Sequence, residues 1–243
     1  ATLAAHLFGL GFEVGGTASC GDRVEDIVET LRFATSRADL VISTGGLGPT
    51  DDDLTAEAVA RLLGETRAMN DEALAGVEAA FRRFGAPMTP TNRKQAMLPP
   101  SARVVPNPQG TAPGFRVETR ECLCFFLPGV PREMKAMWEG TVRPAVVDRW
   151  SLPRPLTAVF RVASAGESSL QHRLKELGEL GDGVELGFRT YMFENHVKLL
   201  LPADALTDES PEIFERACAR VRESLGTDCY SEDEDESLAA VVG

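Results

Sequence analysis

The sequence predicts an α/β protein: a three-layer sandwich with a mostly parallel sheet over residues 1–150, followed by a small α+β domain over residues 156–230. Two observations carry this prediction. Helix patterns alternate with short apolar strands as far as residue 150, and this alternation is typical of a parallel sheet covered on both faces. Beyond Pro153 and Pro155, strands follow strands with helices between them, which is typical of an α+β domain.

Most elements of the first predicted domain have a local signal. Asp22 and Glu25 form a capping box, and the helix that they open carries one apolar stripe. Asn70 is the predicted cap of a helix that ends before Gly85. In chain order we predict helices over residues 2–9, 22–34, 55–63 and 71–84, and strands over residues 12–19 and 40–43. There follow a short helix within residues 88–99, strands over residues 103–105, 115–118 and 122–127, and helices over residues 131–138 and 142–150.

The second predicted domain has a KH-like pattern of strands and helices. We predict strands over residues 156–163, 184–191, 196–201 and 228–230 and helices over residues 167–177 and 211–225. Gly178 and Gly181 fit the GxxG loop with which KH domains clamp RNA. Glu179 and Asp182 would repel a phosphate backbone, so we predict that this domain binds no nucleic acid. Residues 231–243 begin with an acidic run and are interpreted as a linker toward a further domain.

The composition is that of an ordinary soluble globular protein, with 43% hydrophobic and 26% charged residues among 243. The formal net charge of −12 argues against a sequence-independent nucleic-acid binder, which needs clustered Lys and Arg. No apolar run approaches the ~20 residues of a membrane span, and no signal peptide is visible. We therefore expect a cytoplasmic protein with no nucleic-acid or membrane partner.

The five cysteines are few and odd in number, as expected for reduced thiols of a cytosolic protein. Cys122 and Cys124 lie two residues apart in a strand pattern and share one face. No second Cys or His pair completes a metal site around them, so we interpret both as core thiols.

The glycine loop, which we define as residues 44–53, is the main candidate site. An apolar strand leads into it, and a helix pattern begins just after it at Thr55. Glycines let backbone N–H groups approach a phosphate closely, and the positive end of a helix dipole favours an anion. A tight strand-to-helix turn is the alternative, but three glycines in four positions exceed what a turn needs. The predicted phosphate-binding residues of this loop are Thr44, Gly45, Gly46, Gly48 and Thr50.

Three consecutive carboxylates, Asp51, Asp52 and Asp53, close the loop. They can offer oxygen ligands to the Mg²⁺ that phosphate chemistry usually needs. They can equally serve only to place negative charge at a helix N-terminus. The residues alone leave these two roles open.

Four motifs in order resemble the CinA family (competence/damage-inducible protein), whose first domain is of the molybdopterin-binding type found in MoaB and MogA. The resemblance covers nearly the whole chain, including the acidic run near its end. The motifs are Thr44-Gly45-Gly46-Leu47-Gly48-Pro49-Thr50 continued by Asp52-Asp53-Leu54-Thr55, then Lys94-Gln95-Ala96, then Asn107 with Gly110-Thr111-Ala112-Pro113-Gly114, and finally Leu127-Pro128-Gly129-Val130-Pro131 with Glu133-Met134.

The resemblance implies an α/β sandwich with metal-dependent ADP-ribose pyrophosphatase activity. On the motif match, Asp53 is the first choice for holding Mg²⁺, Mn²⁺ or Co²⁺ or activating water, and Asp52 is the second. Family members begin with a strand and a Gly-Asp-Glu loop that this sequence lacks. The family's separate C-terminal domain, a nicotinamide-mononucleotide amidase, is also not expected in this chain.

The other candidate residues each have a structural alternative. Lys94, with Arg93 beside it, can stabilise charge on phosphoryl oxygens or be ordinary surface charge. Glu133 follows a Pro-Gly-x-Pro turn and is either a helix cap or a second carboxylate of the site. Asn107, Gly110 and Thr111 are predicted to contact a nucleotide, or else form only a turn. Pro128 and Gly129 complete the predicted wall of the pocket.

Three functions stay open on the sequence. The first is a nucleotide-binding, metal-dependent hydrolase of ADP-ribose-type pyrophosphates. The second is a molybdopterin- or nucleotide-binding domain without turnover. The third is the structural and oligomerising half of a nicotinamide-nucleotide amidase. The expected partners are a small-molecule nucleotide or pterin ligand, which the first two functions require, and a second copy of the chain in a homodimer.

Overall fold

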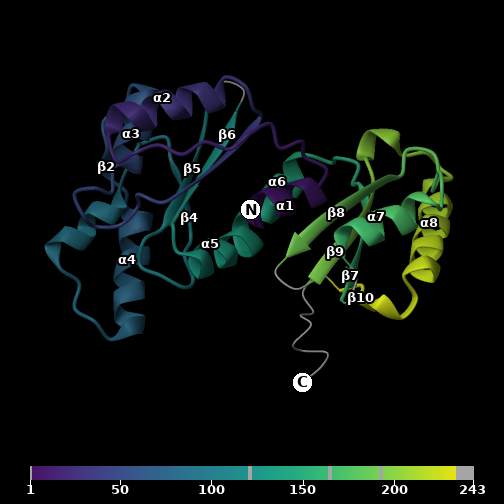
Figure 1. The fold of residues 1–243 in the computed structure, drawn as a ribbon. Helices are drawn as coiled ribbons and strands as arrows, with labels where there is room; N and C mark the ends of the chain where they lie inside the picture. Colours follow the sequence, from purple (N-terminus) through teal and green to yellow (C-terminus); the bar gives the residue numbers. More distant parts are fainter. Residues whose placement is uncertain (1, 120–121, 164–165, 192–193, 234–243) are drawn as a thin grey trace. The chain divides into compact units, whose positions relative to one another are not determined.

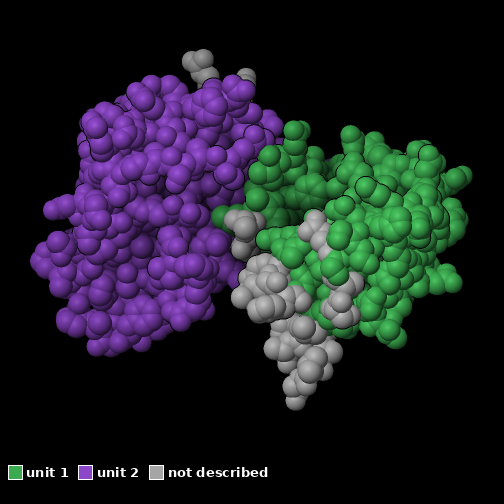
Figure 2. Space-filling view, viewed as in Figure 1, with its two compact units in different colours: residues 1–14, 152–243 green, residues 15–151 purple. Residues whose placement is uncertain are grey.

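The computed structural model describes residues 2–119, 122–163, 166–191 and 194–233. The chain divides into two compact units, which Figure 2 shows in different colours. The first unit is residues 15–151, and the second unit is residues 1–14 together with residues 152–243. Within the described part of the chain, no helix is both long and apolar enough to cross a membrane.

The first unit is built on a four-stranded sheet with the order β1-β6-β5-β4. Its strands are β1 (Leu40–Thr44), β4 (Arg103–Val105), β5 (Gly114–Glu118) and β6 (Leu123–Leu127). β1 and β6 run parallel, whereas β6 with β5 and β5 with β4 run antiparallel. The described sheet is therefore mixed rather than mostly parallel, because the connections around β5 are too short for the crossover that a parallel pair needs.

Helices cover both faces of this sheet and confirm the predicted α/β sandwich. α2 (Val24–Thr35) and α3 (Thr55–Leu63) lie on one side, and α5 (Pro131–Met137) and α6 (Arg143–Arg149) lie on the other (Figure 1). β6 is buried along its whole length, as expected for a strand covered on both faces. A π-helical segment, η2 (Trp138–Val142), joins α5 to α6.

A smaller substructure of the first unit carries residues that line the candidate site. It consists of α4 (Asp71–Phe84), the 3₁₀ helix η1 (Pro90–Ala96) and the antiparallel pair β2 (Ala68–Met69) with β3 (Met97–Leu98). The predicted cap of α4 is confirmed, since the Asn70 side chain accepts a hydrogen bond of 2.9 Å from the Ala73 N–H.

Two local predictions near the start of the first unit differ from the structure. No strand or helix is assigned between Phe12 and Arg23, where a strand was expected over residues 12–19. A strand needs a neighbour, and no described strand pairs with this glycine-containing stretch. The Asp22 capping box is also not formed, because α2 begins after Arg23 and has no side-chain cap.

The second unit combines helices with one four-stranded sheet, as expected for an α+β fold. Its strands pair antiparallel in the order β10-β7-β9-β8. The N-terminal helix α1 groups with this unit, although residues 15–151 of the first unit separate it from the rest of the unit in sequence. Its elements are α1 (Thr2–Gly9), β7 (Leu156–Val162), α7 (Glu167–Lys175), β8 (Glu185–Tyr191), β9 (Glu194–Leu201), the short η3 (Ala203–Ala205), α8 (Ser210–Leu225), η4 (Gly226–Asp228) and β10 (Cys229–Ser231).

A buried polar cluster crosses the sheet of the second unit. Glu194 accepts a hydrogen bond of 2.6 Å from Arg161 and another from Tyr230, and its carboxylate lies 2.8 Å from His196 Nε2. The Arg161 and Glu194 side chains are each 9% exposed. Burial alone would raise the pKa of Glu194, but the hydrogen bonds from Tyr230, Arg161 and His196 lower it to about 2. The cluster therefore joins three strands through one ionised carboxylate.

Replacing Gly114 with alanine should destabilise the first unit by about 1–3 kcal/mol, because the added Cβ overpacks the sheet. This Cβ would lie 2.6 Å from both the Phe126 carbonyl oxygen and Met137 Cε. Urea unfolding followed by tryptophan fluorescence reports this unit, since both tryptophans, Trp138 and Trp150, lie in it.

Gly140→Ala is the matched control, because its added Cβ would have no atom within 4 Å and it lies in a helical segment. This variant should be as stable as the parent chain or slightly more stable. Equal unfolding midpoints for the two variants would contradict the predicted overpacking at Gly114.

Candidate functional site

The glycine loop and the Pro128–Gly129 turn meet at one edge of the sheet. Thr44 and Leu127 are register partners at the ends of the parallel strands β1 and β6. The Gly45 N–H continues this ladder with a hydrogen bond of 2.9 Å to the Leu127 carbonyl. A Cβ on Gly129 would lie 3.4 Å from Gly45 Cα. The two motifs are therefore adjacent because parallel strands bring their carboxyl ends to the same edge, where open α/β sheets bind ligands.

Glycines in the loop are required by its backbone. Gly45 and Gly46 have φ values of +102° and +67°, which side chains disfavour. A Cβ on Gly46 would overlap the Thr55 side chain, whose hydroxyl donates a hydrogen bond of 2.9 Å to the Gly45 carbonyl. The Thr55 N–H also bonds the Gly46 carbonyl at 3.2 Å. The loop is thus held against the first turn of α3, where a helix N-terminus favours an anion.

Two of the three carboxylates converge on Thr50. Asp53 Oδ2 accepts hydrogen bonds from the Thr50 N–H at 2.9 Å and from its hydroxyl at 2.7 Å. Asp52 Oδ1 lies 2.5 Å from the same hydroxyl, which has a single proton to share. The hydrogen bond from Thr50, and further the Asp52 backbone N–H and the Lys94 charge, lower the pKa of Asp52. Asp51 is exposed and has no part in this hydrogen-bonded group.

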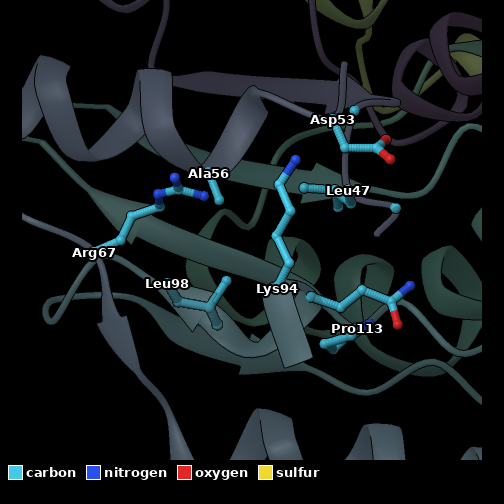
Figure 3. Close-up of a pocket in the computed structure, with 10 residues that line it drawn as sticks. Leu47, Asp53, Ala56, Arg67, Lys94, Leu98 and Pro113 are labelled. Atoms are coloured by element: carbon cyan, nitrogen blue, oxygen red, sulfur yellow. The ribbon is translucent and has the colours of Figure 1, made fainter. Parts of the chain in front are cut away.

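Lys94 lies beside this loop, and η1 positions it there. Its ammonium donates a hydrogen bond to the Thr50 carbonyl. Figure 3 shows Lys94 between Arg67 on one side and Asp53 on the other. These side chains line a small, shallow depression that is open to solvent. The lining residues are Gly46, Leu47, Gly48, Asp53, Ala56, Arg67, Lys94, Gln95, Leu98 and Pro113.

Asn107, Gly110 and Glu133 form a separate cluster. The Asn107 side-chain N–H groups donate to Glu133 Oε2 at 2.7 Å and to the Ala112 carbonyl at 2.8 Å. Its side-chain oxygen accepts from the Gly110 N–H at 2.9 Å. A Cβ on Gly110 would overlap the Glu133 carboxylate. These three residues fasten the loop before β5 to the first turn of α5, and they do not line the depression.

The predicted site residues therefore fall into groups. Gly46, Gly48, Asp53 and Lys94 line the depression. Thr50 hydrogen-bonds to Asp53 and Lys94 of that set, and Asp52 accepts a hydrogen bond from the Thr50 hydroxyl. The strand-end residues are Thr44, Gly45, Pro128 and Gly129, of which Pro128 is buried. Thr111 reaches the depression through Gln95, whose amide donates to its hydroxyl at 3.3 Å. Arg93 is exposed and lies outside the lining set.

Two polar lining residues, Arg67 and Gln95, were not among the site residues predicted from the sequence. Arg67 pairs with Glu57 of α3 at 2.8 Å, and no sequence signal marks it. Gln95 is only 6% exposed, and its side-chain oxygen has no hydrogen-bond partner among the described residues. Gln95 does stand in the Lys94-Gln95-Ala96 motif, which was the available signal. Arg67 and Gln95 therefore add polar side chains to the depression from outside the glycine loop.

The carboxylates of Asp52 and Asp53 suit a divalent cation that is also coordinated by a phosphate. Among the described residues there is no group of three or more His, Cys, Asp or Glu that could hold a metal ion. Asp52 and Asp53 meet on one hydroxyl, and Mg²⁺ is commonly held by one or two carboxylates together with phosphate oxygens and water. Cys122 and Cys124 are buried free thiols with their sulfurs 3.7 Å apart.

Comparison with known proteins gives consistent matches. A family model described as a probable molybdopterin binding domain matches residues 1–148. A CinA-like protein of Geotalea uraniireducens (strain Rf4) is 36% identical over 246 residues, covering 99% of this chain and 58% of the relative. The NMN amidohydrolase-like protein YfaY of Escherichia coli (strain K12) is 42% identical over 205 residues, covering 84% of this chain and 51% of the relative.

A solved structure of a CinA protein also matches this chain. The crystal structure of the protein CinA from Thermoplasma acidophilum, described as of unknown function, matches with a TM-score of 0.54 and 35% sequence identity. The match covers 59% of this chain and 83% of that chain. This chain spans about half the length of the curated relatives that it matches.

Proposed function

This chain belongs to the CinA family, and we propose that its first unit is a nucleotide-binding, metal-dependent hydrolase of ADP-ribose-type pyrophosphates. One observation carries the proposal: the glycine loop ends in Asp52 and Asp53, and Lys94 hydrogen-bonds to the same loop. Anion-binding backbone, carboxylates and a cation are the parts that phosphoryl-transfer chemistry uses.

Each part has a distinct role in the proposed reaction. Backbone N–H groups of the glycine loop bind one phosphate, and the ammonium of Lys94 lies next to them to neutralise phosphoryl oxygens. Asp52 and Asp53 would hold Mg²⁺, Mn²⁺ or Co²⁺, which supplies charge stabilisation for the phosphoryl oxygens when bound. Asp53 also lines the depression, where its carboxylate orients the attacking water. Hydrolysis of ADP-ribose would yield AMP and ribose 5-phosphate.

A binding domain without turnover is the second candidate, and the hydrogen bonds of Asp53 favour it. One of its two carboxylate oxygens accepts two bonds from Thr50, as in a purely structural turn. A third candidate is one half of a larger, oligomeric amidase, by analogy with the name of the E. coli relative. In that case this chain would supply a subunit contact, and a homodimer is the assembly we propose.

Removing divalent metal should abolish AMP release from ADP-ribose. The expected result is turnover with Mg²⁺, Mn²⁺ or Co²⁺, none in excess EDTA, and recovery on adding metal back, because the phosphoryl oxygens then regain their counter-charge. Chromatographic measurement of AMP tests this. Tight binding of ADP-ribose without AMP in any metal would favour the second candidate, and no binding would leave the third.

A further inference from the structure

We propose that Gln95 is a specificity-determining residue that recognises a sugar hydroxyl of the ligand, beside the phosphate held by the glycine loop. This inference rests on the proposed function only for the identity of the phosphate ligand. It assigns the depression next to the loop to the pentose-phosphate half of a nucleoside diphosphate sugar, not to its base.

The first observation is an unused hydrogen bond. Gln95 lines the depression and is 6% exposed, which is unusual for a glutamine. Its amide nitrogen donates to the Thr111 hydroxyl at 3.3 Å, while its oxygen is buried without a partner among the described residues. A buried polar atom left unpaired is destabilising, because it has lost its hydrogen bonds to water. A ligand that pairs it recovers this free energy, so Gln95 favours a ligand with a polar hydrogen at this position.

The second observation identifies the kind of group. A hydroxyl can both donate and accept a hydrogen bond. It can therefore pair with either the oxygen or the nitrogen of the Gln95 amide, whichever faces the ligand. The terminal torsion of a glutamine is broad, so the amide can turn toward an incoming group. Arg67, also in the lining, offers N–H donors to the remaining oxygen lone pairs of a sugar. Figure 3 shows the Arg67 guanidinium directed toward the space beside Ala56 and Lys94.

The third observation argues against the base. None of the ten lining residues, all within the described part of the chain, is aromatic. Bases are commonly held by stacking on aromatic side chains. The lining instead combines two cations, one carboxylate and the Gln95 amide with four small or aliphatic side chains. Such a surface fits a sugar phosphate, which has anionic oxygens, hydroxyls and a small apolar face.

The test compares ribose 5-phosphate with inorganic phosphate as two probes of the same depression. The parent chain should bind ribose 5-phosphate about tenfold more tightly than phosphate, as expected for one extra satisfied hydrogen bond. Gln95→Met keeps the length and volume of the side chain. This variant should bind ribose 5-phosphate and phosphate about equally tightly, with its affinity for phosphate unchanged. Isothermal titration calorimetry measures both affinities.

Gln109→Met is the matched control, because Gln109 is exposed in the loop before β5 and does not line the depression. It should retain the tenfold preference, and both variants should keep the parent's thermal midpoint. A parent chain that does not prefer ribose 5-phosphate, or a Gln95→Met chain that keeps the preference or loses both ligands equally, would overturn the inference.

AMP release from ADP-ribose by the parent chain is measured in parallel. Turnover combined with an unchanged preference in Gln95→Met would overturn the role of Gln95 and leave the hydrolase standing. No turnover, combined with a preference that depends on Gln95, would support the sugar subsite and reject the hydrolase.

Discussion

Asp53→Asn should slow AMP release from ADP-ribose by about 100-fold, the size expected when one electrostatic group is removed from a phosphoryl-transfer site. Asparagine has the same shape as aspartate, and its oxygen can still accept the hydrogen bonds from the Thr50 N–H and hydroxyl. Only the negative charge is removed. A large loss in this variant therefore reports metal holding or water orientation rather than collapse of the turn.

Steady-state rates of AMP release across a Mg²⁺ titration measure this effect. The metal concentration for half-maximal activity should also rise, because one of the two carboxylates proposed to hold the cation has lost its charge. Asp51→Asn is the matched control, since it makes the same charge change two residues away at an exposed position. If the two variants were equally active, Asp53 would have only the structural role that its bonds to Thr50 already explain.

Glu194→Gln should destabilise the second unit by about 3 kcal/mol, because removing one partner of a buried ion pair leaves the other charge poorly compensated. The Arg161 guanidinium, on β7, would lose a charged hydrogen bond of 2.6 Å, and the hydrogen bond from Tyr230 on β10 would be weakened. Urea unfolding followed by far-UV circular dichroism measures the loss. Fluorescence of Trp138 and Trp150, which reports the first unit, should keep its midpoint.

Glu185→Gln is the control for this variant, because Glu185 is exposed on β8 of the same sheet. The control should unfold within about 0.5 kcal/mol of the parent chain. Similar losses for Glu185→Gln and Glu194→Gln would contradict a special role for the buried pair.

The cost of Glu194→Gln should depend on pH. The pKa of Glu194 is lowered in the folded chain to about 2 from an ordinary value of 4.5. A depressed carboxyl pKa stabilises the fold fully above the unfolded-state value and loses this contribution as pH falls toward the folded-state value. The difference between parent and variant should therefore be constant above about pH 5 and shrink between about pH 4.5 and 2. A difference that does not change over that range would contradict the assignment.

The sequence predicts the elements whose signals are local. Helix α3 is observed over Thr55–Leu63 as expected, and Asn70 caps α4, because a cap and an apolar stripe act within a few residues of the chain. The glycine loop was also evident, since the positive φ values at Gly45 and Gly46 need glycine wherever the loop lies in space. The three carboxylates at the end of this loop could be recognised because they are consecutive in the sequence.

What only the tertiary structure decided is which distant segments meet. The sheet order β1-β6-β5-β4 depends on the pairing of β1 with β6, two strands about 80 residues apart, and no local pattern identifies such a partner. Arg67 and Gln95 became candidates because β2, η1 and α3 pack around one depression, and Glu133 proved to be bonded to Asn107. Side-chain environments of this kind depend on contacts between residues tens of positions apart. The loop proposed to bind phosphate could therefore be identified from the sequence, whereas the roles proposed for Arg67 and Gln95 could not.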